Sequence, residues 1–342
     1  MAPSDSRVDS DSPIGPDSWI GSDSPTSPDA SIDPTLLEEG VAGRTVLVTG
    51  GAGFIGSHLA SVLEPADRVR VLDDLSSGRR ERVPDHATLI EGDVRDPDAV
   101  ERAAAGADVI FHQAAVVSVD RSIEVPRASH AVNVGGTLEL LEAARREDAR
   151  FVCASSAAIY GSPDELPVRE SDPKRPQSPY GIEKLAVDHY CQRYHDLYGL
   201  DTVALRYFNV YGPGQSGGQY SGVIDVFTRQ AVAGDAITVH GDGAQTRDFV
   251  HVRDVVDANL RAATTGTVGE AVNVATGESV TIRELAELIR DRTGSDSPIR
   301  LTEPREGDVR HSRADVAKAA RVLGYEPTVS IEAGLGRLVG PS

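Results

Sequence analysis

A tyrosine and a lysine four residues apart are the pair in this sequence best suited to do chemistry. Tyr180 and Lys184 stand in Ser178-Pro-Tyr-Gly-Ile-Glu-Lys184, where Ser178 predicts a helix N-cap and Pro179 a first helical position. The four-residue spacing places both side chains on one face of that helix. A nearby ammonium group favours the phenolate, but keeping a tyrosine ionised near neutral pH takes roughly 4 kcal/mol. One lysine does not supply that much, so the pair is catalytic only beside a second fixed positive charge and is otherwise an ordinary helix surface.

A glycine-rich turn near residue 50 predicts where such a charge could come from. Gly50-Gly-Ala-Gly53-Phe-Ile-Gly56 lies between an apolar, β-branched run at 45–49 and a predicted helix over 54–63. Glycines at this point permit a tight turn, let the backbone approach a pyrophosphate and let the helix pack closely on the strand. The spacing is Gly-x-x-Gly-x-x-Gly rather than Gly-x-Gly-x-x-Gly, but the strand and helix stand where a dinucleotide site requires them. An oxidised nicotinamide ring held there would carry the missing positive charge.

A carboxylate at the end of the second predicted strand indicates which dinucleotide binds. Asp73 follows Gly50 by 23 positions, close to the spacing of about 20 expected of a ribose-binding acid. Its carboxylate can accept both ribose hydroxyls and would repel a 2′-phosphate, so NAD is favoured over NADP. Arg79 and Arg80 leave NADP open as a minority alternative, and the neighbouring Asp74 is either a second contact or a solvated residue.

Two more predicted strands end in residues that could face the same ligand. Asp93 and Val94 follow the third strand, where an adenine amino group would lie, although a turn aspartate explains Asp93 equally well. Ser156 follows the fifth strand in Ala154-Ser-Ser-Ala-Ala158. Its hydroxyl could form a hydrogen bond to the same substrate oxygen from which Tyr180 would take a proton. Serine-rich turns are common, but a strand, a serine and Tyr-x-x-x-Lys in this order are far more specific.

Alternating strands and helices predict the framework that positions these residues. Such alternation is typical of an α/β fold with a doubly wound parallel sheet of the Rossmann type, which binds ligands at the carboxyl ends of its strands. The predicted strands are 45–49, 68–73, 87–91, 108–112, 150–155 and 202–208, and the longer predicted helices are 126–147 and 178–198.

Composition divides the chain into three parts. Residues 1–42 are rich in Ser, Asp and Pro and cannot bury enough apolar surface to offset their ordering entropy, so we expect a disordered acidic tail. Residues 43–210 are expected to form, in the main, the NAD-binding Rossmann domain. Residues 211–342 have Gly-rich loops and predicted helices over 252–263, 282–292 and 313–323. We expect them to form a smaller substrate-binding region, with some segments returning to the sheet.

Whole-chain composition narrows the classes of partner. The 342 residues are 39% hydrophobic and 25% charged, as is usual for a globular protein, and the formal net charge of −19 argues against binding nucleic acid or an anionic membrane. No run of about 18 apolar residues predicts a membrane span. Cys153 and Cys191 have no metal or disulfide spacing, which favours a reducing cytoplasm. The scarcity of lysine among many acids suggests a halophilic protein kept soluble by salt screening.

Several motifs together resemble one known family. The turn from Thr49 to Gly56, Ser155-Ser156 and Tyr180-x-x-x-Lys184 are similar to those of the extended short-chain dehydrogenase/reductase family of NAD-dependent sugar-nucleotide epimerases and dehydratases. Leu205-Arg-Tyr-Phe-Asn-Val-Tyr-Gly-Pro213 and Arg247-Asp-Phe-Val-His-Val252 match it too, and the resemblance covers residues 44 to about 337. It implies that Ser156, Tyr180 and Lys184 are catalytic. The NAD contacts that it implies are Gly50, Gly53, Phe54, Ile55, Gly56, Asp73, Asp74, Asp93, Val94, Gln113, Ala114, Ala115, Asn133, Tyr180 and Lys184.

The residues after the catalytic serine indicate the reaction within that family. Dehydratases carry an Asp-Glu pair there and the decarboxylase branch a Glu, whereas Ala157 and Ala158 can neither donate nor accept a side-chain proton. Elimination is therefore disfavoured, and the pattern is most similar to the UDP-hexose 4-epimerase branch. Tyr180 would take the proton of the sugar 4-hydroxyl while C4 gives a hydride to NAD⁺, and the resulting 4-keto sugar would turn over and take the hydride back. A UDP-glucuronate 4-epimerase, another oxidoreductase or dehydratase of the family, and, more remotely, a non-catalytic NAD-binding module stay open.

The resemblance also implies how a nucleoside diphosphate sugar is held. Asn209, Arg247 and Arg305 would bind the diphosphate, as guanidinium groups suit phosphate. Asp308 would bind a ribose, and Val239 would lie near the base. Where glucose-restricted relatives carry a bulky tyrosine, this chain has Ser312, which predicts room for a 2-acetamido group. The family habit further implies a homodimer built through two helices of the sheet domain.

Overall fold

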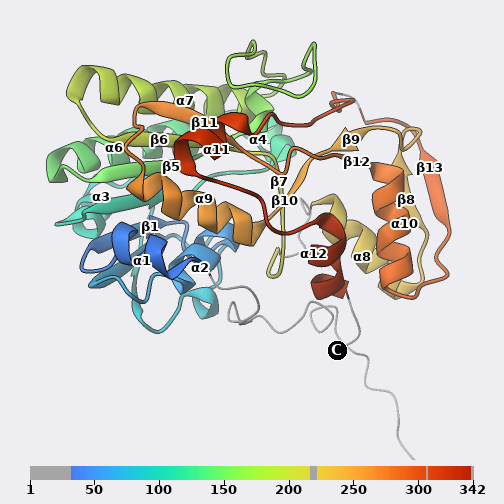
Figure 1. Ribbon diagram of the computed structural model, residues 1–342, viewed down its shortest axis with the longest axis horizontal. Coiled ribbons are helices and arrows are strands. Elements are labelled where there is room, and N and C mark those ends of the chain that lie inside the picture. The colour runs from blue at the N-terminus through green and yellow to red at the C-terminus, as the bar shows by residue number, and fades with distance from the viewer. Residues whose placement is uncertain (1–31, 216–221, 306, 340–342) are drawn as a thin grey trace, which may run out of the picture.

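Seven parallel strands form the central sheet of the computed structural model, which describes residues 32–215, 222–305 and 307–339 (Figure 1). The order across the sheet is β11-β6-β5-β4-β1-β2-β3. The doubly wound parallel sheet expected from the sequence is thereby confirmed. Its strands are β1 (Thr45–Thr49), β2 (Arg68–Asp73), β3 (Ala87–Glu91), β4 (Val109–His112), β5 (Arg150–Ser156), β6 (Thr202–Tyr207) and β11 (Glu270–Val274).

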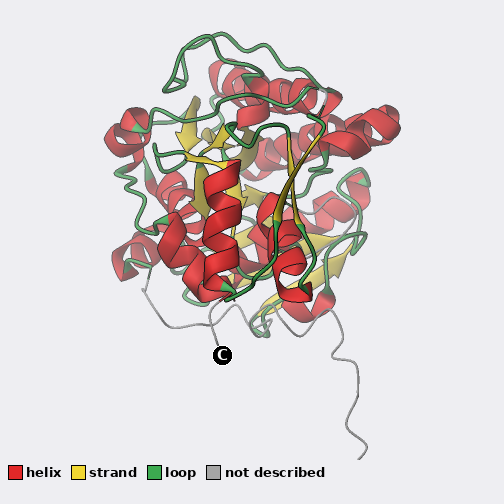
Figure 2. Cartoon of the chain, turned by 90° about the vertical axis from the view of Figure 1, so that its right-hand side faces the viewer, coloured by secondary structure: helices red, strands yellow, loops and turns green. Residues whose placement is uncertain are grey.

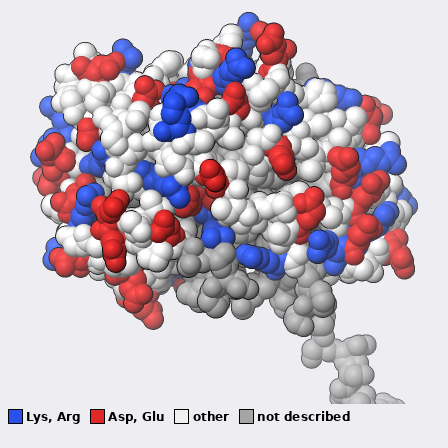
Figure 3. Space-filling view, viewed as in Figure 1, with Lys and Arg blue, Asp and Glu red and all other residues white. Residues whose placement is uncertain are grey.

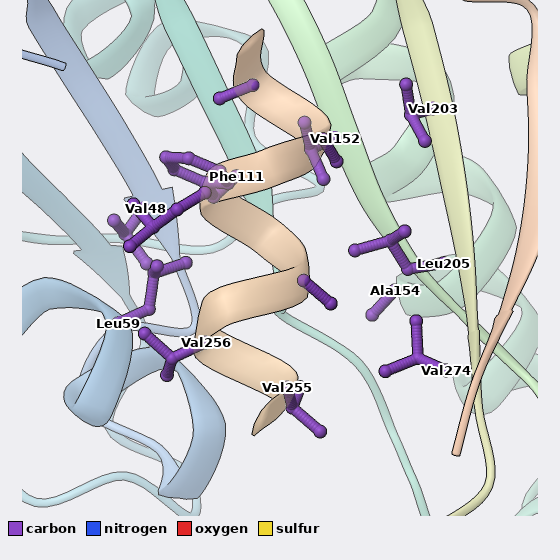
Figure 4. Close-up of a cluster of buried hydrophobic side chains, with 14 of the residues drawn as sticks. Val48, Leu59, Phe111, Val152, Ala154, Val203, Leu205, Val255, Val256 and Val274 are labelled. Carbon is purple, nitrogen blue, oxygen red and sulfur yellow. The ribbon is translucent and has the colours of Figure 1, made fainter. Parts of the chain in front are cut away.

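Both faces of the sheet are covered, because successive side chains of a strand point to opposite faces. In β1, Val46 and Val48 enter one apolar cluster, whereas Leu47 enters another. The first cluster packs under α1 (Pro34–Gly40), α2 (Phe54–Ser61), α9 (Val252–Thr264) and α11 (Ala317–Leu323), and Figure 4 shows α9 crossing the strands there. The second cluster packs under α3 (Pro97–Ala104), α6 (Gly136–Glu147) and α7 (Pro179–Tyr198). Sheet strands buried on both faces explain the nearly continuous apolar runs of the sequence.

A smaller region lies at one end of the sheet, on the right of Figure 1, and faces the viewer in Figure 2. Its apolar core is separate from the two sheet clusters. The elements that build it are α8 (Val223–Ala233), β8 (Ile237–His240), α10 (Ile282–Arg292), β13 (Ile299–Thr302) and α12 (Ile331–Val339). Two short ladders, β7 (Asn209–Tyr211) with β10 (Phe249–His251) and β9 (Thr246–Arg247) with β12 (Val280–Thr281), complete the fold.

The chain returns to the sheet after it has entered the smaller region. Strand β11 pairs with β6 along its whole length, and α9 covers the central strands. The boundary drawn at residue 210 therefore cuts a sheet whose seventh strand comes from residues 270–274. That strand, Glu-Ala-Val-Asn-Val, was not among the strands predicted from the sequence.

One part of the expected disordered tail is helical. Helix α1 lies within residues 1–42 and begins at Asp33, whose carboxylate accepts from the Thr35 amide at 2.9 Å. Leu36 and Leu37 pack against the sheet's first apolar cluster, and Val41 is fully buried in it. The expectation of disorder is wrong for this stretch, because Leu36, Leu37 and Val41 pack against the first apolar cluster of the sheet. The amino-acid composition of the tail does not reveal this contact. Residues 1–31 lie outside the described part of the chain.

The predicted helix over 126–147 contains a π-helical turn. Helix α5 (Pro126–His130) continues through Ala131–Gly135 with π geometry into α6. Such bulges are often found at functional sites. No helix among the described residues is long and apolar enough to cross a membrane. On the face shown in Figure 3, the described acidic and basic side chains are interspersed rather than gathered into a basic patch.

Candidate functional site

A pocket of about 510 Å³ opens at the carboxyl ends of the sheet strands, where a doubly wound sheet places its ligands. Loops after β1, β2, β3, β4, β5 and β6 all reach it. Most of the site residues predicted from the sequence line it. They are Gly50, Gly53, Phe54, Ile55, Gly56, Asp73, Asp74, Asp93, Val94, Gln113, Ala114, Ala115, Ser156, Tyr180 and Lys184.

The glycine turn forms a cradle in which a side chain would have no room. Gly50 has a φ of 69°, and a Cβ there would lie 2.7 Å from the Ala114 amide nitrogen. A Cβ on Gly56 would lie 2.2 Å from the Gly50 carbonyl oxygen. The turn is closed by the Gly53 amide, which donates to the Gly50 carbonyl at 3.0 Å. Bare backbone at the start of α2 is what a dinucleotide pyrophosphate requires.

Asp73 lies on the pocket wall and ties the loops around it together. Its carboxylate accepts from the Ala52 amide at 2.9 Å and from the Leu75 amide at 2.8 Å. Burial raises the pKa of this carboxyl, while the two amide hydrogen bonds oppose that rise. A carboxylate oxygen has a second lone pair besides the one used by an amide. Asp73 can therefore hold the turn and still accept a ribose hydroxyl.

The two other acids near this end of the pocket shape turns. Asp74 accepts from both the amide and the hydroxyl of Ser76, at 2.9 and 2.6 Å. Asp93 accepts from the Arg95 amide at 2.8 Å and pairs with the Arg95 guanidinium, whose hydrogen bonds lower the pKa of the carboxyl. Asp93 is therefore a turn aspartate that also lines the pocket, and its contact with an adenine amino group stays a prediction.

The catalytic candidates converge from α7 and the end of β5. Ser178 caps α7 by accepting from the Gly181 amide at 3.1 Å, so the pair begins in the first turns of that helix. The Lys184 Nζ donates to the Ala154 carbonyl at 2.8 Å and lies 6.0 Å from the centre of the Tyr180 ring. Ser156 ends β5 and lines the same pocket. One hydroxyl, one phenol and one ammonium therefore border a common space.

The protein alone does not hold Tyr180 as a phenolate. Burial raises the pKa of the Tyr180 phenol, with the side chain of Ser156 acting in the opposite direction and Glu183 adding to the rise. Burial also lowers the pKa of the Lys184 ammonium to about 8. Another positive charge in the pocket would favour the phenolate, as opposite charges within about 4–6 Å lower the pKa of an acid. The pair therefore fits a site that also receives an oxidised nicotinamide.

A buried polar layer supports the floor of the pocket. His112 lies 2.7 Å from Thr49 Oγ1 and 2.9 Å from Thr137 Oγ1, and burial lowers the pKa of its imidazole to about 3. Gln113 donates to the Tyr207 hydroxyl at 3.2 Å, and this hydroxyl also contacts Asn259. These neutral groups fix the loop after β4 without adding charge to the site.

Two of the predicted contacts have buried side chains that do not line the pocket. Asn133 is 1% exposed and lies behind the pocket wall, where its amide group accepts from the Val116 N–H at 2.7 Å and donates to the Val116 carbonyl at 3.0 Å. Val239 is 0% exposed, because β8 turns it into the apolar core of the smaller region. Val132, beside Asn133, lines the pocket, whereas no residue of β8 does.

The remaining substrate candidates gather beside the smaller region. Arg247 forms an ion pair with Asp308, and burial lowers the pKa of its guanidinium. The Ser312 amide donates to the carbonyl of Thr246 at 3.2 Å, which places Ser312 next to this pair. Arg305 is exposed three residues before Asp308. Asn209 lies in β7, opposite Phe249 of β10, between two residues that line the pocket.

Some pocket residues were missed from the sequence. Tyr207 and Phe208 stand inside the quoted Leu205–Pro213 motif, and Val116 follows the predicted Ala114-Ala115 directly, so proximity to a motif could have found them. Arg82 and Gln215 offered no such signal. The pocket-lining residues that were not predicted from the sequence are Leu72, Ser76, Ser77, Arg82, Gly92, Val116, Val117, Val132, Ala154, Ser155, Tyr207, Phe208, Val210, Gln215 and Gly222.

The two cysteines lie close together, which their positions in the sequence do not indicate. Cys153 in β5 and Cys191 in α7 are both buried, and their Sγ atoms lie 3.0 Å apart. The 38 positions between them give no hint of this contact. Helix α7 brings them together because it packs directly on β5. Both are free thiols in the structure.

Known proteins share this framework over most of its length. The model of the NAD dependent epimerase/dehydratase family matches residues 46–275. A UDP-glucose 4-epimerase of Mycolicibacterium smegmatis is 40% identical over 302 residues, which are 86% of this chain and 96% of that protein.

Solved structures agree with the sequence relatives. A UDP-glucose 4-epimerase of Thermotoga maritima, solved with UDP-glucose, superposes with a TM-score of 0.84 at 40% identity, covering 86% of this chain and 97% of that one. A UDP-N-acetylglucosamine 4-epimerase of Methanobrevibacter ruminantium, solved with UDP-N-acetylmuramic acid, has a TM-score of 0.84 at 36% identity, covering 87% and 98%.

Proposed function

This chain belongs to the NAD-dependent epimerase/dehydratase family and is an NAD-dependent UDP-sugar 4-epimerase; we propose that it interconverts UDP-glucose and UDP-galactose and also accepts their N-acetylated forms. When bound, NAD⁺ would supply a reversible hydride acceptor for C4 of the sugar. The glycine cradle at Gly50 and Gly56 and the carboxylate of Asp73 would hold the cofactor.

The chain's own residues move the proton. Tyr180, as phenolate, takes the proton of the sugar 4-hydroxyl and gives it back after the sugar has turned over. Lys184 supports the phenolate and holds the nicotinamide ribose, while Ser156 orients the 4-oxygen. The observation that carries this proposal is the convergence of these three groups on one pocket, beside Ala157 and Ala158, which offer no proton for elimination.

The diphosphate must stay fixed while the sugar rotates. We assign diphosphate binding to Asn209, Arg247 and Arg305. Asp308 would bind the uridine ribose. The Arg247–Asp308 ion pair supports the assignment because it holds a guanidinium and a carboxylate side by side, as neighbouring phosphate and ribose groups would require. A guanidinium has five N–H donors, so one bond to Asp308 leaves donors for phosphate.

Tolerance of an acetamido group follows from the small side chain at position 312. A Ser312→Tyr substitution should lower kcat/KM for UDP-N-acetylglucosamine relative to UDP-galactose at least about tenfold, since a pocket discriminates on this scale by shape. The ratio of the two initial rates checks it. Equal use of both sugars by the variant would refute the role of Ser312.

Proton NMR of the purified protein with UDP-galactose, and then with UDP-N-acetylglucosamine, tests the proposed activity. Without added reductant, a second anomeric signal should grow to a constant ratio with the first. No new signal from either sugar, in a folded protein that releases NAD on denaturation, would overturn this substrate assignment and leave the cofactor intact.

We further propose that the protein works as a homodimer through the α7 surface. Tyr190, Leu197 and Tyr198 are exposed there, and Leu197 is 69% exposed. They line a second, shallow pocket together with Arg193 and Tyr194. Exposed apolar groups of this size favour a protein contact. Light scattering should give a mass of twice the chain mass for the wild-type protein. The Leu197→Asp variant should give a mass smaller than that of the dimer.

A further inference from the structure

A carboxylate stands between the two catalytic candidates and has no place in the mechanism above. Glu183 immediately precedes Lys184 in α7 and is 3% exposed. The side chains that donate to it are uncharged: the Ser129 hydroxyl and the Asn133 amide both donate to Oε2 at 2.7 Å. Burying a carboxylate is costly unless its hydrogen bonds are made, so these two donors are what allows Glu183 to be buried beside the catalytic candidates.

The hydrogen bonds lead from Glu183 to the wall of the NAD pocket. Asn133 belongs to the π-helical turn, and its side chain holds both the N–H and the carbonyl of Val116. Val116 lines the pocket with Ala115 and Val117. The carboxylate thus orients an amide group, and the amide group fixes a pocket wall at a point where the backbone itself forms no strand.

The same residue acts on the acid–base pair through its charge. Burial raises the pKa of the Tyr180 phenol and lowers that of the Lys184 ammonium, and the negative charge of Glu183 adds to the first change and opposes the second. The other groups that face this turn are Ser156, Cys153 and Cys191, and His112 from β4, which is neutral because its pKa is about 3. From α4 (Val119–Glu124) and α5 the facing side chains are serines, while the charged residues there are exposed: Asp120, Arg121, Glu124, Arg127 and His130.

We propose that Glu183 is a positioning residue with two effects: through Asn133 it fixes the Val116 wall of the NAD site, and through its charge it sets the pH range in which Tyr180 and Lys184 work. The second effect rests on the proposed epimerase function. The first concerns NAD binding alone.

Two substitutions separate the effects. Glu183→Gln keeps an oxygen that can accept from Ser129 and Asn133 but removes the charge. NAD⁺ affinity should stay within about twofold of wild type, and both limbs of the pH–rate profile should move to lower pH by about one unit, because a unit charge within one helical turn of both groups acts with this strength. Glu183→Ala removes charge and hydrogen bonds, so it should show the same pH shift and also bind NAD⁺ at least about tenfold more weakly, or about 1.4 kcal/mol.

The measurements are the pH dependence of epimerisation, followed by NMR, and titration of NAD⁺ by calorimetry. Asp196→Asn, which removes an exposed charge from the same helix, should change neither. A Glu183→Gln variant with a lower rate but an unmoved pH profile would overturn the charge effect, whether or not Glu183→Ala folds. Unchanged NAD⁺ affinity in Glu183→Ala would overturn the wall effect, even if wild type turns over no UDP-hexose.

Discussion

At the scale of single residues, the account depends on the phenol of Tyr180. Tyr180→Phe should leave the fold and the bound NAD unchanged, since the ring contacts are kept, and should lower the rate about 10²–10⁴-fold, the usual contribution of a positioned acid–base group. Rates by NMR, melting temperature and NAD content check this. A variant with a near-normal rate would remove Tyr180 from the mechanism.

Residue-level prediction from the sequence worked where backbone chemistry dictates the residue type. Glycine is required at positions 50 and 56 because a Cβ there would lie only 2.7 and 2.2 Å, respectively, from neighbouring backbone atoms. A sequence motif reveals constraints of this kind. The side chains of Val239 and Asn133 are buried outside the pocket, and a motif does not reveal which way a side chain turns. Glu183 was passed over, since its role depends on Ser129 and Asn133, which are 54 and 50 positions away.

At the scale of elements, the junction between the first strand and α2 should tolerate no side chain at Gly56. Gly56→Ala would press a Cβ against the Gly50 carbonyl at 2.2 Å and should weaken NAD binding at least about tenfold, or about 1.4 kcal/mol. Gly135→Ala is the matched control, since nothing lies within 4 Å of a Cβ there and its φ is helical. NAD content after purification measures both, and equal loss from the two variants would contradict the cradle.

Helix α7 should owe much of its attachment to a buried ion pair. Arg206 of β6 donates to both carboxylate oxygens of Asp188, at 2.8 and 2.9 Å, and their side chains are only 4% and 0% exposed. Asp188→Ala would leave an unpaired buried guanidinium and should lower the free energy of unfolding by about 3–5 kcal/mol. Asp196→Ala, which breaks an exposed pair in the same helix, should cost about 0–1 kcal/mol. Denaturant-induced unfolding measures the loss of stability in both variants. Similar losses would show that the buried pair stabilises the protein no more than the exposed pair does.

The elements themselves were largely predictable, because strands buried on both faces leave apolar runs and α7 carries its own cap. Strand β11 and helix α1 were not, since each is stabilised by a partner distant in sequence. Strand β11 needs β6, and α1 needs the surface of α9. Local pattern does not encode such partners.

At the scale of the whole molecule, the formal charge of −19 raises the hypothesis of a salt-adapted protein. Screening weakens repulsion among exposed acids, so the melting temperature should rise steadily from dilute buffer to molar KCl. Thermal melts at several salt concentrations measure this. A protein equally stable and active without salt would rule the hypothesis out.

The central claim is that C4 of the sugar loses a hydride and then takes the same hydride back, without exchange with solvent. UDP-glucose carrying deuterium at C4 tests it most directly, with the product isolated from ordinary water and examined by NMR and mass spectrometry. The account predicts that the UDP-galactose formed keeps the deuterium at C4. Replacement of the deuterium by solvent hydrogen would contradict it, because that result requires removal of a proton from carbon rather than transfer of a hydride.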